Sequence, residues 1–409
     1  MNEGPTLKRS LGLPLITLYG LGTVIGAGIF VLIGEVASSA GMFAPVAFLI
    51  ASLLAGFTAF SFAELASRFP KSAGEAVYVQ EGFGWRPLSV TVGLLVALAG
   101  MVSCATIANG FVGYLHEFAA LPDWLVVVAV VLGLGIIAVW GIVESVTIAA
   151  LITIVEAGTL VVVVAMAGDA FTTLPARLPE LLPPAEGAVW SGILGGSVLA
   201  FFAFIGFEDM VNVAEEVKDA PRIMPRAIIT VLIAAMTLYA AVSLVAVLTV
   251  PPADLAASGA PVAVIFERAT GLSAAPISAI VLVAVLNGAL IQIVMAARVF
   301  YGLANMGLLP ARLATVNART RTPLMATALA TAIVLGFALW LPLLTLAKLT
   351  SLVTRVVFVM INLALVRIKR RSPPVEGGFT CPFWVPLAGF VFSAGFAAFQ
   401  IAGFAGFLA

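Results

Sequence analysis

Two glycine-containing segments interrupt long apolar stretches, and their residue types are the best suited in this chain to bind a ligand. Residues 23–30 contain Gly26 and Gly28, and residues 201–209 contain Gly206. Glycine favours local unwinding of a helix, and unwound backbone offers N–H groups to an anion and carbonyl groups to a cation. Paired breaks at corresponding positions indicate a membrane transport site. Close packing against a neighbouring helix is the alternative role for each glycine.

Ionisable and polar side chains inside the apolar stretches form a second set of candidates. Glu156 lies mid-stretch, Glu208 directly follows the second break, and Arg355 lies in a later stretch. A charge at the bilayer centre costs about 2.5–3.5 kcal/mol, so Glu156 is suited either to exchange a coupled proton or to stay protonated as a structural hydrogen-bond donor. Polar residues that could contact a ligand or a neighbouring helix are Ser103, Thr106 and Asn287.

The composition is that of an integral membrane protein. The chain has 409 residues, of which 62% are hydrophobic and 10% charged, and its mean hydropathy is +1.18. Because a helix needs roughly 20 residues to cross the bilayer, the length allows about a dozen spans and no soluble catalytic domain. The two cysteines, Cys104 and Cys381, indicate neither a disulfide framework nor a metal site. We expect no cofactor, no metal and no nucleic-acid partner.

The apolar stretches predict an all-α membrane protein with about eleven spans. The spans are expected near residues 14–39, 43–68, 87–116, 123–140, 145–167, 190–213, 227–250, 275–303, 323–342, 346–368 and 384–408. Lys and Arg concentrate in alternate connections, which predicts a cytoplasmic N-terminus. The basic residues that depart from this pattern are Arg177, Arg268, Lys348 and Arg355.

Four segments resemble the amino acid–polyamine–organocation (APC) superfamily of secondary transporters. They are residues 22–30 (GTVIGAGIF), residues 201–225 (from FFAFIGFE through AEEVKDAPR), residues 63–78 and residues 287–310. The resemblance implies a five-plus-five inverted-repeat fold in which spans one and six are discontinuous. It divides a single transport domain, residues 1–409, into repeats at 14–167 and 190–368 and an additional span at 384–408. Many family members have a twelfth span that is not evident here, which leaves the oligomeric state open.

The resemblance also places a substrate between the two breaks. Backbone N–H groups expected to bind its carboxylate belong to Gly26, Ala27 and Gly28. Carbonyl groups expected to bind its ammonium belong to Val24, Ile25, Phe202 and Ile205. Phe202 further matches an aromatic position that closes over the substrate, and Glu208 matches an acid that couples the site to the inner gate. Glu215, Glu216, Lys218 and Asp219 match an inner-gate motif, although their composition alone indicates a solvent-exposed loop.

The expected function is secondary active transport of amino acids by alternating access, coupled to protons, in the cytoplasmic membrane. An amino-acid exchanger, or a polyamine or amine carrier without proton coupling, is the alternative with the same fold. A channel or a transporter-like sensor is a remote alternative, because the chain has no filter-like repeat or charge ring and no added soluble domain. An enzyme is not expected, because no catalytic constellation lies at membrane depth. The sequence leaves the substrate itself open.

Overall fold

The structure is a computed structural model that describes residues 7–25, 27–116, 121–258, 260–340, 343–373 and 377–406. These residues are almost entirely helical. The β-type pairing that they contain is one isolated parallel bridge between Leu11 and Val217. The expectation of an all-α protein is therefore confirmed.

Each expected span corresponds to a helix or to a broken pair of helices. The elements are α1 (Leu13–Ile25) with α2 (Ala27–Ala40), α3 (Ala44–Arg68), α5 (Arg86–His116), α6 (Asp123–Trp140), α7 (Ile142–Met166), α9 (Gly187–Phe202) with the 3₁₀ segment η2 (Phe207–Glu216), α10 (Ala220–Thr249), α13 (Ala275–Asn305), α14 (Leu324–Trp340), α15 (Leu343–Arg371) and α16 (Trp384–Gly406). By length and composition, eight segments of the described chain can cross a membrane, and two apolar helices are shorter.

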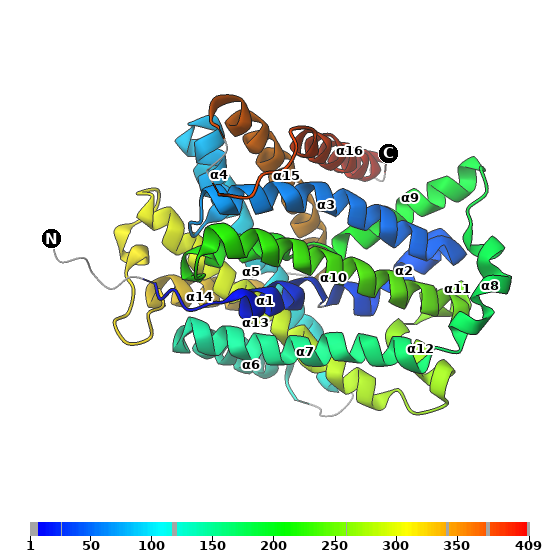
Figure 1. The fold of residues 1–409 in the computed structure, drawn as a ribbon. Helices are drawn as coiled ribbons and strands as arrows, with labels where there is room; N and C mark the ends of the chain where they lie inside the picture. Colours follow the sequence, from blue (N-terminus) through cyan, green and yellow to red (C-terminus); the bar gives the residue numbers. More distant parts are fainter. Residues whose placement is uncertain are drawn as a thin grey trace.

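Short helices connect the spans at both ends of the bundle. They are α4 (Gly74–Phe83), α8 (Ala170–Leu181), α11 (Pro252–Ala257), α12 (Pro261–Thr270) and the 3₁₀ turns η1 (Gly41–Phe43) and η3 (Ala311–Ala314). The spans lie side by side, with α4 at one end of the bundle and α8 and α11 at the other (Figure 1). Among the packed pairs are α3 with α10, α5 with α13, and α15 with α16.

Span six is discontinuous, as expected. In span one, α1 ends at Ile25 and α2 begins at Ala27, and Gly26 between them lies outside the described residues. In the sixth span, α9 ends at Phe202 and η2 begins at Phe207. Between them Gly206 has a φ of +128°, a backbone conformation that side chains with a Cβ rarely adopt. The glycine therefore allows the chain to turn between the two halves of this span.

Candidate functional site

The two breaks contact each other through glycines. A Cβ built on Gly28 would lie 2.9 Å from the Ala203 Cα, and a Cβ on Gly206 would lie 2.9 Å from the Thr23 carbonyl carbon. Close-packed interiors have no room for an added atom at such separations. Each break therefore presents a glycine to the backbone of the other, so the glycines serve both unwinding and close packing.

Tyr239 of α10 also bridges the two breaks. Its buried hydroxyl lies 2.6 Å from the Val24 carbonyl oxygen and 3.2 Å from the Ala203 carbonyl oxygen. Because one hydroxyl carries one proton, the shorter contact marks Val24 as the main acceptor. Tyr239 was not among the predicted site residues. The signal available in the sequence was a single tyrosine within a long apolar span.

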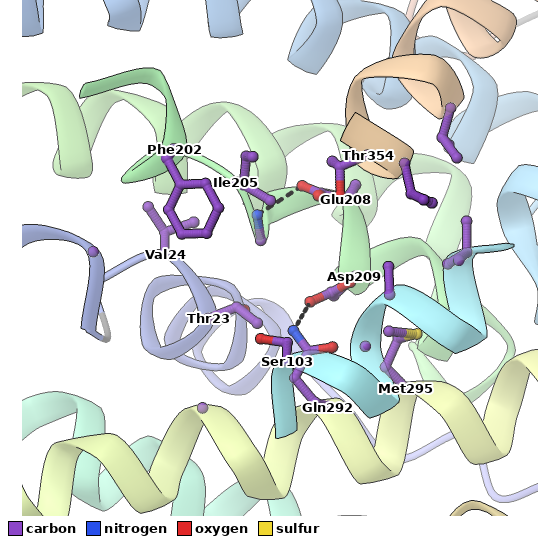
Figure 2. Close-up of a pocket in the computed structure, with 18 of the residues that line it drawn as sticks. Thr23, Val24, Ser103, Phe202, Ile205, Glu208, Asp209, Gln292, Met295 and Thr354 are labelled. Carbon is purple, nitrogen blue, oxygen red and sulfur yellow. Dashed lines mark hydrogen bonds between the residues drawn. The ribbon is translucent and has the colours of Figure 1, made fainter. Parts of the chain in front are cut away.

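A cavity of about 250 Å³ lies beside the joined breaks. The predicted residues that line it are Val24, Gly28, Ser103, Thr106, Phe202, Ile205 and Glu208. In Figure 2, Val24, Phe202 and Ile205 lie on one part of the lining, and Ser103, Gln292 and Met295 lie on another. The cavity thus brings backbone from both breaks together with side chains from α5 and α13.

Three carboxyl groups line this cavity: those of Glu75, Glu208 and Asp209. Glu208 Oε2 accepts a hydrogen bond from the Gly206 N–H at 2.7 Å, and Asp209 Oδ2 accepts one from Gln292 Nε2 at 2.8 Å (Figure 2). Among the described residues, the lining contains no Lys, Arg or His. These carboxyl groups would stabilise a ligand that carries positive charge when they are ionised.

Glu75 is the least expected of these acids. It lies near the start of α4, and its Oε1 accepts a hydrogen bond from Asn212 Nδ2 at 3.3 Å. Its Oε2 is buried and has no hydrogen-bond partner in the described part of the chain. Glu75 was not among the predicted site residues, although it lies within a segment that carries the family resemblance. A cationic ligand group would supply the missing partner.

The pKa of Glu75 is raised from 4.5 to about 8, mainly by burial. The charge on Asp209 also raises it, whereas hydrogen bonds from the backbone and from Asn212 lower it. Between these two values the carboxyl group is ionised in the unfolded state and protonated in the folded state, so the contribution of Glu75 to stability falls as pH rises. Above about pH 8 both states are ionised and this contribution levels off.

We expect the melting temperature of the purified protein to fall between pH 5 and pH 8, and the fall to be smaller in Glu75→Gln. Thermal melting at fixed ionic strength would measure both proteins. Glu267, an exposed acid in α12, offers the control Glu267→Gln, which makes the same substitution outside the cavity. A Glu75→Gln profile as steep as that of the wild type would show that another acid dominates the titration.

Glu156 and Asn287 lie outside the cavity lining and contact each other. Asn287 Nδ2 donates to Thr153 Oγ1 at 3.0 Å and to Glu156 Oε1 at 3.2 Å, and all three side chains are buried. Asn287 thus links α13 to α7. It does not line the cavity, contrary to the expectation from the sequence. A Cβ on Gly22 of α1 would collide with Thr153 Oγ1 and Asn287 Nδ2. This Glu156–Asn287–Thr153 cluster therefore packs directly against α1, one turn before the first break.

The described cavity lining does not include the remaining candidates from the sequence. Ile25 is buried and does not line the cavity, and Ala27 contributes the first residue of α2. Gly26 lies outside the described residues. Arg355 of α15 is buried as well, and its Nη2 lies 3.4 Å from the Val198 carbonyl oxygen.

The solvent-exposed loop that composition indicated after the second break is only partly exposed. Glu216 is fully buried and forms a two-point pair with Arg298 of α13, with Nε to Oε2 at 3.1 Å and Nη2 to Oε1 at 3.2 Å. Lys218 and Asp219 are exposed. The N–H groups of Ser10 and Leu11 also donate to the Glu216 carbonyl. Glu216 is buried because η2 continues into the bundle against α13, so it joins three distant parts of the chain.

Comparison with known proteins establishes the family. The sequence profile of the amino acid permease family matches residues 11–408. The chain belongs to the amino acid permease family. It is therefore a multi-pass membrane transporter and not an enzyme, and the APC superfamily to which such permeases belong implies the inverted-repeat fold.

Three relatives show how varied the similar proteins are. This permease is 30% identical to the branched-chain amino acid permease BcaP of Bacillus subtilis (strain 168), over 92% of its own length and 84% of the relative's. It is 31% identical to the vacuolar cationic amino acid transporter 4 of Arabidopsis thaliana, over 91% and 65% of the two chains. It is 27% identical to the methylthioribose transporter of Bacillus subtilis (strain 168), over 93% and 86%.

Proposed function

We propose that this permease is a secondary active transporter that carries amino acids across the cytoplasmic membrane by alternating access, with protons as the coupling ion. The cavity beside the joined breaks is the main support. Ala27 and Gly28 open α2 at its N-terminus, where backbone N–H groups are suited to bind a carboxylate. The ammonium group would lie near the carbonyls of Phe202 and Ile205, two residues that line the cavity, while Tyr239 holds the Val24 carbonyl.

We further propose the domain arrangement and orientation that the sequence suggested. Repeats at 14–167 and 190–368 would each begin with one discontinuous span, and residues 384–408 would add a peripheral span. The N-terminus would be cytoplasmic. The contact between Gly28 and Ala203, and the contact between Gly206 and Thr23, are consistent with two related halves that meet at their broken helices.

A second candidate substrate class has a specific observation in its favour. Glu75, Glu208 and Asp209 all line the cavity, and a carboxylate without a cation is costly in a buried site. An amino acid with a cationic side chain, or an amine, would place its extra charge among them. The names of the relatives divide in the same way, because one is a branched-chain permease and another a cationic amino acid transporter.

Competition binding separates these candidates. We expect an amino-acid amide and an N-acetyl amino acid each to compete at least about tenfold more weakly than the parent amino acid, because each lacks one of the two groups that the breaks recognise. Thermal shift against the twenty amino acids would first identify the parent. Putrescine would test for an amine carrier, since it has two ammonium groups and no carboxylate. Strong competition by both blocked amino acids would argue against a site at the two breaks.

A further inference from the structure

A second cavity, of about 240 Å³, lies away from the substrate site and is strongly basic. Its lining consists of Arg68, Lys369, Arg370, Arg371, Ser372 and Pro373. The cationic residues come from the C-terminal ends of α3 and α15, which are far apart in the sequence. No carboxyl-bearing residue is part of this lining in the described chain.

Glu64 organises the base of this basic pocket. It is fully buried, and its Oε1 accepts hydrogen bonds from Arg68 Nε at 3.0 Å and Nη2 at 2.7 Å. Its Oε2 accepts from Lys369 Nζ at 2.6 Å and from the Cys381 N–H at 2.9 Å. One carboxylate therefore fixes two cations and can neutralise only one of them.

The remaining positive charge faces outward. Arg370 and Arg371 are exposed, and the Arg370 guanidinium lies 5.7 Å from the centre of the Phe383 ring. Arg68 Nη1 donates to the Pro373 carbonyl at 3.1 Å, which holds the two sides of the pocket together. A concave site with both buried and exposed cations is well suited to a phosphate group, which accepts several charge-assisted hydrogen bonds.

The surface next to the basic pocket is apolar. Trp384, Leu387 and Val391 are exposed on α16, and their spacing of three and four residues places them along one face of the helix. Phe383, which contacts Arg370, is exposed immediately before them. A molecule bound in the pocket can thus extend from a polar end at the cations to an apolar end on α16. That pattern matches a lipid.

We propose that the basic pocket binds the phosphate group of an anionic membrane lipid, whose acyl chains lie along α16. Helix C-termini and the cytoplasmic side of a membrane favour basic residues in general. That preference does not account for cations from two distant helices that converge on one cavity over a shared buried carboxylate. A zwitterionic lipid would bring the positively charged group of its headgroup next to the cations of the pocket, so the site should bind such a lipid more weakly than an anionic one.

Native mass spectrometry of the delipidated full-length protein tests this proposal. We expect the wild type to retain added phosphatidylglycerol in preference to phosphatidylcholine. The double variant Arg370→Gln/Arg371→Gln should bind phosphatidylglycerol roughly 30-fold more weakly, and Arg370→Lys/Arg371→Lys should restore most of the binding. Arg312→Gln/Arg319→Gln is the matched control, because both residues are exposed and removing them lowers the charge equally.

Three results would overturn the proposal. They are equal retention of the two lipids, unchanged phosphatidylglycerol binding in Arg370→Gln/Arg371→Gln, and an equal loss in the control variant. A measurement with inorganic phosphate would distinguish a lipid headgroup from a free phosphate ion as the ligand of the pocket. If phosphate alone raises the melting temperature as much as phosphatidylglycerol and displaces the lipid, the pocket binds a free anion and the lipid assignment is wrong.

Discussion

Gly28→Ala is expected to weaken substrate binding by roughly 5- to 150-fold while the protein stays folded. The new Cβ would lie 2.9 Å from the Ala203 Cα, and backbone cannot move away as a flexible side chain can. Overpacking of this kind costs roughly 1–3 kcal/mol. If this cost is met by moving the first break away from the second, the same free energy is lost from substrate binding, which gives the stated range of affinities. A larger side chain, as in Gly28→Leu, would push the breaks farther apart.

Gly158→Ala provides the matched control, since a Cβ at that helical position would meet no atom within 4 Å. Titration of both variants with the amino acid found in the binding screen would give the affinities, and thermal melting would report folding. Unchanged affinity in Gly28→Ala would mean that the breaks do not form the binding site. Equal losses in the two variants would point to a general effect of alanine.

The positions of the spans and of the breaks could be predicted because they depend on local sequence. Long apolar stretches define the helices, and the glycine-containing segments at residues 23–30 and 201–209 mark where two of them are interrupted. The φ of +128° at Gly206 is a local property of the same kind. Val24, Gly28, Phe202, Ile205 and Glu208 line the cavity from these segments and were predicted for that reason, whereas Thr23 and Asp209 line it without having been predicted. The role of these residues in binding stays a prediction.

The residues that the sequence did not reveal depend on contacts between distant parts of the chain. The composition around Glu216 indicated an exposed loop and the family resemblance indicated an inner-gate motif, but neither identified its partner Arg298, which lies on a helix 82 residues farther along. Glu75 enters the cavity because α4 folds back against Asn212 of η2. Tyr239 contacts the breaks from α10, which belongs to neither of the two broken spans. Residue type and spacing carry no signal for such convergence.

Glu156→Gln is expected to keep substrate binding and to lose the acceleration of uptake by an inward proton gradient. Glutamine resembles the protonated carboxyl group, and its side-chain oxygen can still accept the hydrogen bond from Asn287 Nδ2. The proton gradient acts only on a group that can release its proton. Ionised Glu156 would be a buried charge with Asn287 as its single hydrogen-bond donor in the described chain, so release should rearrange the contact between α7 and α13.

That rearrangement would reach the substrate site through α1. Gly22 packs directly on Thr153 and Asn287, so a shift of either side chain changes the support beneath the first break. Uptake into proteoliposomes, with and without a proton gradient and in the absence of sodium, would measure the coupling, and Glu267→Gln would serve as the control. Gradient-driven uptake that survives in Glu156→Gln but disappears in Glu75→Gln would move the proton site into the cavity. A requirement for sodium would exclude protons as the sole coupling ion.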